Sequence, residues 1–167
     1  MNLYILRHGM AVERGSPGFK TDADRPLTPK GRRQLGQTAA AMQTVGLDFS
    51  LILSSPFLRA RQTAEIVARS LKLKKRLAFS DELTPDGDPK ALIRQLNDLG
   101  HAPENVLLVG HEPYLSRLVT LLISGSAATN IELKKGGLCK LETNALRFGR
   151  CATLAWLLTP KQMKWMV

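Results

Sequence analysis

Two histidines of this 167-residue chain each stand just after a short apolar run. His8 follows residues 3–6 and one arginine, and His111 follows residues 106–109 and one glycine. Apolar runs of this length predict buried strands, and open α/β sheets bind their ligands at the carboxyl ends of strands. We therefore expect the two histidines to belong to one site, whose composition favours histidine-centred phosphoryl chemistry.

Arginines stand beside the first histidine and in a third strand-end segment. Arg7 precedes His8, and Arg59 lies on the first turn of a helix predicted to begin after the sequence SSP at residues 54–56. A helix N-terminus offers free backbone N–H groups and a partial positive charge to an anion. A guanidinium fork binds two phosphoryl oxygens at once and stays charged. Together with His111, these groups predict the phosphate clamp that phosphoryl transfer requires beside an in-line nucleophile.

To attack phosphorus, His8 must be neutral. Arginines nearby lower the pKa of a histidine and so favour the neutral ring. One ring nitrogen is then expected to donate to a backbone carbonyl, which leaves the other free to attack. A phosphohistidine formed in this way divides one difficult displacement into two easier ones.

The elements that must position these residues alternate along most of the chain. Strands are predicted over residues 2–7, 49–53, 77–79 and 105–109. Helices are predicted from the Thr28-Pro29 cap to Gly46, from residues 54–56 to Leu71, from residues 86–89 through Leu96, and over residues 113–123. Three further strands, over residues 131–133, 138–142 and 153–158, follow one another through tight turns.

This order of elements predicts the fold class. Strands that alternate with helices form a mostly parallel sheet covered on both faces. The last strands follow one another too closely for helical crossovers, so at least one of them is antiparallel. The sequence therefore predicts an α/β, three-layer αβα sandwich that forms a single domain over residues 1–167.

The chain is basic, with a formal net charge of +10. Such a field steers anionic substrates, although a plain basic surface, helped by the lysine-rich run at residues 72–76, explains the charge equally well. Nucleic-acid binding is disfavoured because aromatic residues make up only 5% of the chain. Neither a secretory signal nor a membrane span is evident, and Cys139 and Cys151 are expected to be reduced thiols. We therefore expect a cytoplasmic protein.

Six motifs extend over nearly the whole chain. They are YILRHGMA at residues 4–11, RPLTPKG at 25–31, LILSSPFLRARQTA at 51–64, ELTPDGDP at 82–89, LLVGHEP at 107–113 and LKKGGLCKLE at 133–142. In this order they resemble the histidine phosphatase superfamily, with its phosphoglycerate-mutase-like fold, and within it the small bacterial phosphohistidine phosphatases of the SixA type. The resemblance implies that His8 is the nucleophile and that Arg7, Arg59 and His111 form the phosphate pocket. We expect the enzyme to use no metal or other cofactor, because the cationic groups already neutralise the phosphoryl oxygens and the sequence shows no metal-ligand cluster.

The proton donor for the leaving group is the least determined residue. The resemblance points to a carboxylate in a Leu-x-Glu segment after the second helix, for which Glu82 is the nearest match. A capping role for Glu82 is an equally good interpretation, and Asp22 and Asp24 are alternative acids. A phosphoramidate has a leaving nitrogen that can be protonated before attack, so such a substrate needs no strong acid. Lys135 is a further candidate, for the rim of the phosphate pocket.

The spacing of the motifs also bears on the substrate. No long insertion separates the second strand from the GHEP segment, which leaves little chain for a lid and favours a protein or peptide in an open site. The sequence thus predicts a phosphatase that acts on phosphohistidine in a partner protein. A phosphatase of small phosphate esters and a non-catalytic phosphate- or nucleic-acid-binding module are the alternatives.

Overall fold

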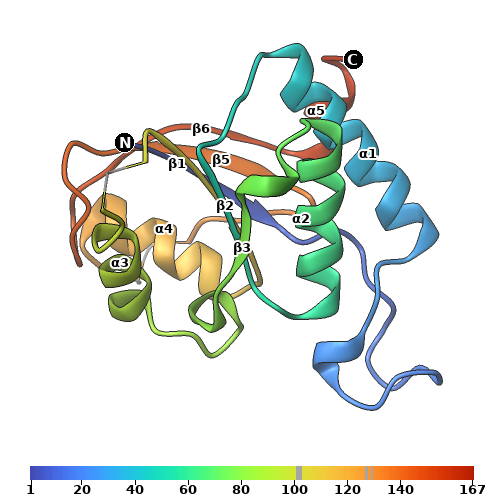
Figure 1. Ribbon diagram of the computed structural model, residues 1–167. Helices are drawn as coiled ribbons and strands as arrows, with labels where there is room; N and C mark the ends of the chain where they lie inside the picture. Colours follow the sequence, from blue (N-terminus) through green and yellow to red (C-terminus); the bar gives the residue numbers. More distant parts are fainter. Residues whose placement is uncertain (101–102, 127, 129) are drawn as a thin grey trace.

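A six-stranded sheet with the order β3-β2-β4-β1-β5-β6 forms the centre of the molecule (Figure 1). The computed structural model describes residues 1–100, 103–126, 128 and 130–167. The strands are β1 (Asn2–Arg7), β2 (Leu51–Ser54), β3 (Leu77–Phe79), β4 (Asn105–Gly110), β5 (Leu138–Glu142) and β6 (Thr153–Leu158). The first four strands are all parallel to their neighbours among themselves, whereas β5 is antiparallel to both of its neighbours, β1 and β6. The predicted mixed, mostly parallel sheet is confirmed.

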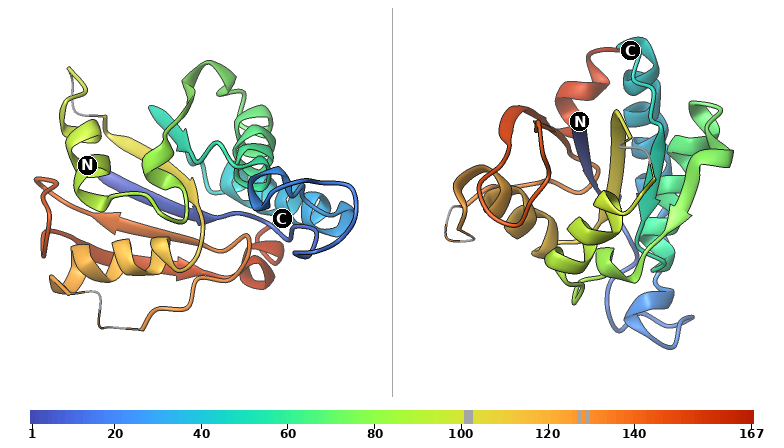
Figure 2. Two further views of the ribbon diagram at one scale, coloured as in Figure 1. Left: turned by 90° about the horizontal axis from the view of Figure 1, so that it is seen from below. Right: turned by 60° about the vertical axis from the view of Figure 1, so that its left-hand side comes forward.

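Helices cover both faces of this sheet (Figure 2). One face carries α1 (Pro29–Thr44), α2 (Leu58–Ser70) and α5 (Pro160–Lys164), and the other carries α3 (Pro89–Asn97) and α4 (Tyr114–Ser124). Short 3-10 helices are η1 (Asp22–Asp24), η2 (Lys74–Arg76) and η3 (Asp81–Leu83). In β1, Leu3 and Ile5 join the core beneath α3 and α4, while Tyr4 and Leu6 join the core beneath α1 and α2. Successive strand side chains point to opposite faces, so one buried strand serves both cores of the predicted three-layer sandwich.

Several helices begin where a polar cap precedes a proline. Thr28 Oγ1 accepts from the Gly31 N–H at 2.9 Å before α1, and Asp88 Oδ1 accepts from the Lys90 N–H at 2.9 Å before α3. Each cap satisfies an N–H group that has no partner inside the helix. The proline that follows has its φ already set for the first helical position.

Three predicted features of the secondary structure are wrong. Residues 131–133 form no strand, because the Leu133 carbonyl oxygen accepts from Arg7 Nη1 at 2.9 Å instead of pairing with a neighbouring strand. The connection between β5 and β6 is no tight turn but the long segment 143–152. The third is a boundary: the predicted second strand is present as β2 but begins at Leu51 and not at residue 49, and Phe49 before it is a core residue packed edge-on against Tyr4 with ring centroids 5.1 Å apart. Helix α5 was not predicted, although Thr159 and Pro160 repeat the cap of α1.

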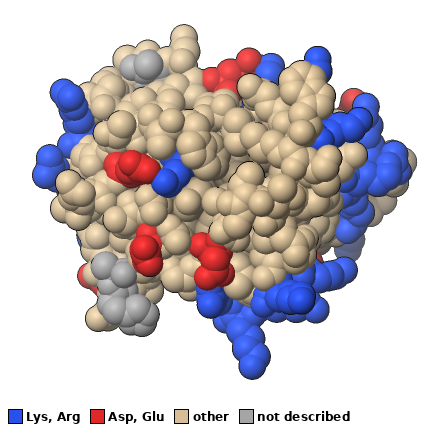
Figure 3. Space-filling view, turned by 90° about the horizontal axis from the view of Figure 1, so that it is seen from above, with Lys and Arg blue, Asp and Glu red and all other residues tan. Residues whose placement is uncertain are grey.

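Charged side chains are unevenly spread over the surface. In Figure 3 Lys and Arg gather most densely along the right-hand and lower right margins, while Asp and Glu side chains lie over the left half of the face. The right-hand side is the side on which Figure 1 shows α1 and the segment that leads to it. No helix in the described part of the chain is long and apolar enough to cross a membrane.

Candidate active site

The carboxyl ends of β1, β4 and β2 bring the predicted site residues to one edge of the sheet. Arg7 lies opposite Gly110 in the parallel β1–β4 ladder, and the His8 N–H donates to the Gly110 oxygen at 3.1 Å. The rings of His8 and His111, which follow these strands, have centroids 5.0 Å apart. A cavity of about 220 Å³ opens here, called below the strand-end cavity. It is lined by Arg7, His8, Ala11, Arg14, Arg25, Arg59, Pro85, His111, Glu112, Pro113 and Lys135.

Hydrogen bonds hold His8 in one tautomer. Its Nδ1 lies 2.7 Å from the Gly9 carbonyl oxygen, and because a carbonyl only accepts, Nδ1 carries the proton. Nε2 is therefore unprotonated, and Arg59 Nε donates to it at 3.3 Å. Burial lowers the pKa of His8 to about 3; the bond to Gly9 opposes this shift, and the nearby Arg and Lys charges reinforce it. His8 is thus neutral near pH 7, with the lone pair on Nε2 that a nucleophile requires.

The end of β1 is fixed against two helices. The Gly9 N–H donates to Thr63 Oγ1 at 3.2 Å, and Thr63 Oγ1 donates in turn to the Arg59 carbonyl at 2.7 Å. A Cβ on Gly9 would lie 2.6 Å from Cδ1 of Leu35, so any other residue would require this buried side chain of α1 to shift. Thr63, in the RARQTA motif, therefore links the segment that carries His8 to the helix that carries Arg59.

Arg59 stands on the first turn of α2 and is only 2% exposed. Besides its bond to His8, it donates from Nη1 to the Asp22 backbone oxygen at 2.6 Å and from Nη2 to Asp22 Oδ2 at 2.8 Å. Its guanidinium carbon lies 5.3 Å from the centre of the Phe57 ring, at the position where α2 begins without a side-chain cap. The guanidinium is thus held between His8 and η1.

Arg7 reaches the cavity from the last position of β1. Its Nη1 donates to the Leu133 oxygen, and the backbone oxygens of Arg7 and His8 accept from the Gly136 N–H at 3.0 and 3.1 Å. Gly136 has a φ of +77°, which glycine adopts readily, and this lets the turn pack against the end of β1. The same turn brings Lys135, predicted at the pocket rim, into the lining of the cavity.

His111 is 1% exposed and lies against the end of β2. Its Nε2 is 2.8 Å from Ser55 Oγ. Burial, and then the neighbouring His8 and Arg59, lower the pKa of His111 to about 2, so this ring is also neutral. Its Nδ1 is buried and has no hydrogen-bond partner among the described residues. A buried unpartnered nitrogen beside a polar cavity is suited to meet a ligand atom.

Asp22, one of the alternative acids, is a partner of arginines. Its Oδ1 accepts from Arg14 Nε at 2.9 Å and Arg25 Nε at 2.8 Å, in addition to the contact of Oδ2 with Arg59. Burial alone would raise the pKa of Asp22, but the arginines together hold it below its ordinary value. An ionised carboxylate is a poor proton donor, so this geometry suits Asp22 to holding Arg59 in place.

Glu112, which the sequence reasoning did not single out, also lines the cavity. Its Oε2 accepts from Ser116 Oγ, and burial raises its pKa above the ordinary value, although Ser116 and Arg7 partly offset the shift. Its place next to His111 in the GHEP motif was the available signal. That signal was ambiguous, because neighbours in sequence need not point toward the same space.

The other candidate acids lie differently. Glu82 Oε2 accepts from the Asp88 N–H at 2.9 Å, next to the start of α3, and Pro85 is the residue of that segment that lines the cavity. Asp24 Oδ2 accepts from the N–H and Oγ1 of Thr21 at 3.2 and 2.7 Å. The assignment of Glu82 as the general acid stays a prediction.

The cavity is suited to bind a phosphoryl group. Five cationic side chains line it, those of Arg7, Arg14, Arg25, Arg59 and Lys135, against the carboxyl of Glu112. Fixed cationic donors around a neutral nucleophile stabilise the charge of a transferring phosphoryl group. Within the described residues, no three His, Cys, Asp or Glu side chains gather closely enough to hold a metal ion.

This chain is similar to known proteins in both sequence and fold. A family model described as histidine phosphatase superfamily (branch 1) matches residues 3–83. A protein of Picosynechococcus sp. is 38% identical over 148 residues, 88% of this chain and 88% of that protein. Phosphohistidine phosphatase SixA of Escherichia coli K12 is 32% identical over 148 residues, 82% of this chain and 88% of SixA. A structure of the protein histidine phosphatase SixA complexed with tungstate superimposes with a TM-score of 0.83 at 29% identity, covering 96% of this chain and 98% of that one.

A putative α-ribazole-5′-P phosphatase of E. coli has the same fold, with a TM-score of 0.76 at 22% identity. The SixA relative is 32% identical and is similar over most of both chains. The chain therefore belongs to the histidine phosphatase superfamily and is a phosphatase.

Proposed function

We propose that this phosphatase removes the phosphoryl group from phosphohistidine in a partner protein, through a covalent phosphohistidine formed on His8. The observation that carries the proposal is the neutral His8 ring with its Nε2 against the Arg59 guanidinium, in a cavity lined by further cations. The relative named phosphohistidine phosphatase SixA supports this choice of substrate. Tungstate, bound in the matching SixA structure, is a tetrahedral oxyanion like phosphate.

The first step transfers the phosphoryl group to the enzyme. His8 Nε2 attacks phosphorus, the N–P bond to the leaving imidazole breaks, and that imidazole departs with the proton it already carries. Arg59 Nε, which donates to Nε2 in the free protein, turns its hydrogen bond to a phosphoryl oxygen. The Arg7 guanidinium and His111 Nδ1 donate hydrogen bonds to the remaining phosphoryl oxygens.

The second step releases phosphate. A water oxygen attacks phosphorus in line, the bond from phosphorus to His8 Nε2 breaks, and the excess proton of the water passes to solvent. The same cationic groups hold the phosphoryl group in both steps, so one cavity serves both displacements.

Exposed cations at the rim of the cavity favour a substrate presented by a protein surface. Arg14 and Lys135, at its edge, are exposed, and the Arg14 side chain is 78% accessible. A phosphorylated side chain can enter such a cavity while the protein that carries it stays outside. This is the second reason for proposing a protein substrate.

The identity of the leaving group decides how much a general acid matters. An oxygen leaving group needs a proton as its bond breaks, whereas the imidazole of phosphohistidine can leave neutral because its other ring nitrogen already carries a proton. If Glu82 is the acid, Glu82→Gln lowers kcat/KM on an alkyl phosphate ester by about 10²-fold and changes phosphohistidine turnover by less than about threefold. Glu65→Gln, at a half-exposed carboxylate on α2, is the matched control. An equal loss on both substrates would contradict this role.

A substrate panel tests the proposed function. The rates are measured on a histidine-phosphorylated protein, a phosphoserine peptide and small sugar and nucleotide phosphates. We expect the histidine-phosphorylated protein to have the highest kcat/KM. A higher kcat/KM on small esters would instead identify a small-molecule phosphatase, and affinity for nucleic acid with no turnover of any substrate would identify a binding module.

A further inference from the structure

A second hollow lies next to the strand-end cavity. This outer hollow, of about 500 Å³, is lined by Arg14, Gly15, Ser16, Phe19, Lys20, Thr21, Asp22 and Arg25. Arg14 and Arg25 line both the strand-end cavity and the outer hollow, so the two are neighbours. The outer hollow is built on the segment between β1 and α1, which projects from the body of the molecule at the lower right of Figure 1.

The outer hollow has an excess of positive charge. Asp22 is the acidic residue in its lining, and its carboxylate already serves Arg14, Arg25 and Arg59. Lys20 is exposed and forms no ion pair with any described residue. Asp22 cannot use all the N–H donors of the arginines around it, and Lys20 adds further donors. The outer hollow can therefore bind another anion.

The donors of Arg14 are the most available. A guanidinium has five N–H donors, and the Arg14 side chain uses Nε on Asp22 and makes no other hydrogen bond to a described residue. Arg25, by contrast, is nearly covered and also donates to the Val12 oxygen at 2.8 Å. Arg14 and Lys20 are therefore the two exposed cations of the outer hollow, and Arg25 is linked to Arg14 through the Asp22 carboxylate.

Resting on the proposed function, we propose that the outer hollow docks an acidic segment of the phosphoprotein substrate, with carboxylates next to the phosphohistidine contacting Arg14 and Lys20. A ring such as that of Phe19 beside exposed arginine is typical of protein interfaces. The hollow is open along a projecting segment, whereas small-ligand sites enclose most of their ligand. Complementary charge of this kind speeds encounter and selects partners.

Two matched peptides test the docking of carboxylates. Both are phosphorylated on a central histidine, and they differ only in having Glu or Gln at the flanking positions. Phosphoimidazole, which carries no flanking residues, serves as the reference substrate. At low ionic strength we expect wild type to show a kcat/KM about fivefold higher on the Glu peptide than on the Gln peptide, and high salt to remove the difference.

Charge reversal at Lys20 locates the effect. Lys20→Glu should reduce the Glu-over-Gln preference to about one or invert it, because it places a like charge beside the peptide carboxylates. Lys20→Ala should give an intermediate preference. Lys75→Glu, in η2, makes the same change of net charge outside the outer hollow and should keep the wild-type preference.

The outcomes separate this inference from the proposed function. If wild type hydrolyses phosphoimidazole and both peptides but does not distinguish Glu from Gln, the docking inference is overturned and the phosphohistidine proposal stands. Equal loss of preference in Lys20→Glu and Lys75→Glu overturns the docking inference too, because net charge would then explain the effect. No turnover of any phosphoramidate overturns the proposed function, and the docking inference with it.

Discussion

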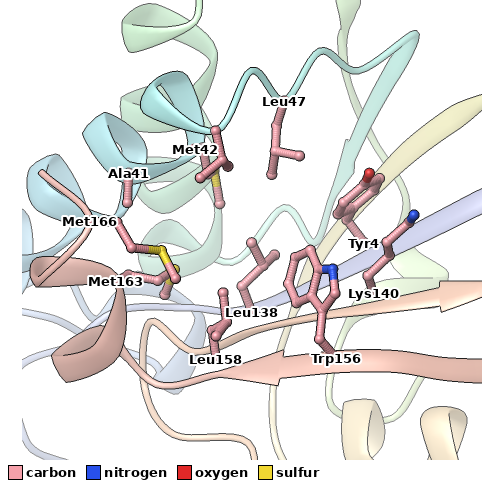
Figure 4. Close-up of a pocket in the computed structure, with 11 residues that line it drawn as sticks. Tyr4, Ala41, Met42, Leu47, Leu138, Lys140, Trp156, Leu158, Met163 and Met166 are labelled. Carbon is pink, nitrogen blue, oxygen red and sulfur yellow. The ribbon is translucent and has the colours of Figure 1, made fainter.

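The strand-end cavity and a second, apolar hollow are built from opposite kinds of side chain. The apolar hollow, of about 470 Å³, is about twice as large as the strand-end cavity of about 220 Å³. Figure 4 shows it between α1, α5 and the sheet, lined by Tyr4, Ala41, Met42, Val45, Leu47, Leu138, Lys140, Trp156, Leu158, Met163 and Met166. Among the described residues, none lines both the apolar hollow and the strand-end cavity.

The difference shows that volume is a poor guide to chemistry in this fold. The apolar hollow remains because α5, only five residues long, covers part of β5 and β6 and leaves apolar side chains open beside it. The strand-end cavity is lined by buried polar groups that specific hydrogen bonds hold in place. Burying polar groups costs free energy, and such groups in a cavity indicate a functional site. We therefore expect substitutions in the strand-end cavity to remove activity and those in the apolar hollow to remove stability.

The largest effect on activity should come from His8→Ala. It removes the nucleophile, so turnover should fall on the order of 10⁴-fold or more. His8 lines the strand-end cavity, so the space that alanine leaves joins this cavity and the urea midpoint should change little. Acid-labile phosphate should be trapped on wild type and be absent from the variant. Near-normal turnover in His8→Ala would rule out its assignment as nucleophile.

Arg59→Lys should have the next largest effect. Lysine keeps the positive charge but cannot contact His8 and the phosphoryl oxygens through one planar group, so kcat/KM should fall about 10²-fold. Vanadate affinity should fall as well. Arg61→Lys is the matched control, since Arg61 is on the same helix with its side chain 50% exposed and paired with Glu65. If the two variants behave alike, the buried position of Arg59 has no special role.

The residues of the strand-end cavity that follow a local sequence pattern could be predicted from the sequence. The apolar runs before His8 and His111 were sufficient to predict β1, β4 and the meeting of these residues, because adjacent parallel strands end at the same edge. Asp22 and Glu112 were harder to assign, since the role of a carboxylate depends on which arginines and hydroxyls the fold brings to it. The strand predicted at residues 131–133 failed because Leu133 is buried and apolar, as a strand residue would be, while its carbonyl oxygen is taken by Arg7.

Acid should destabilise the strand-end cavity through its histidines. The pKa values of His8 and His111 are lowered to about 3 and about 2 in the folded protein, against an ordinary value of 6.5. As pH falls from 6.5 toward 3, these histidines become protonated in the unfolded chain but stay neutral in the folded protein. The free energy of unfolding therefore decreases over this pH range. At pH 5 each histidine should lower the free energy of unfolding by up to about 2 kcal/mol.

Urea unfolding in phosphate-free buffer, at pH 7 and pH 5, measures this loss. His111→Asn cannot titrate and should show about half of the wild-type histidine-linked loss, because His8 remains. A His8→Asn, His111→Asn double variant should show the smallest dependence on pH. The same dependence in the double variant and wild type would assign the acid sensitivity to other groups.

The smallest effect on activity should come from the apolar hollow. Trp156 packs against Tyr4 with ring centroids 5.9 Å apart and is partly exposed, so Trp156→Ala removes apolar contacts on the α5 side of the sheet. The free energy of unfolding should fall by about 1–2 kcal/mol, less than for a fully buried tryptophan, and kcat/KM on phosphoimidazole should stay within about twofold of wild type. Trp165→Ala is the matched control, because Trp165 is 73% exposed and its loss should change the stability by less than about 0.5 kcal/mol. A tenfold loss of kcat/KM in Trp156→Ala, with little loss of stability, would mean that the hollow acts on the strand-end cavity, and the separation of chemistry from packing would fail.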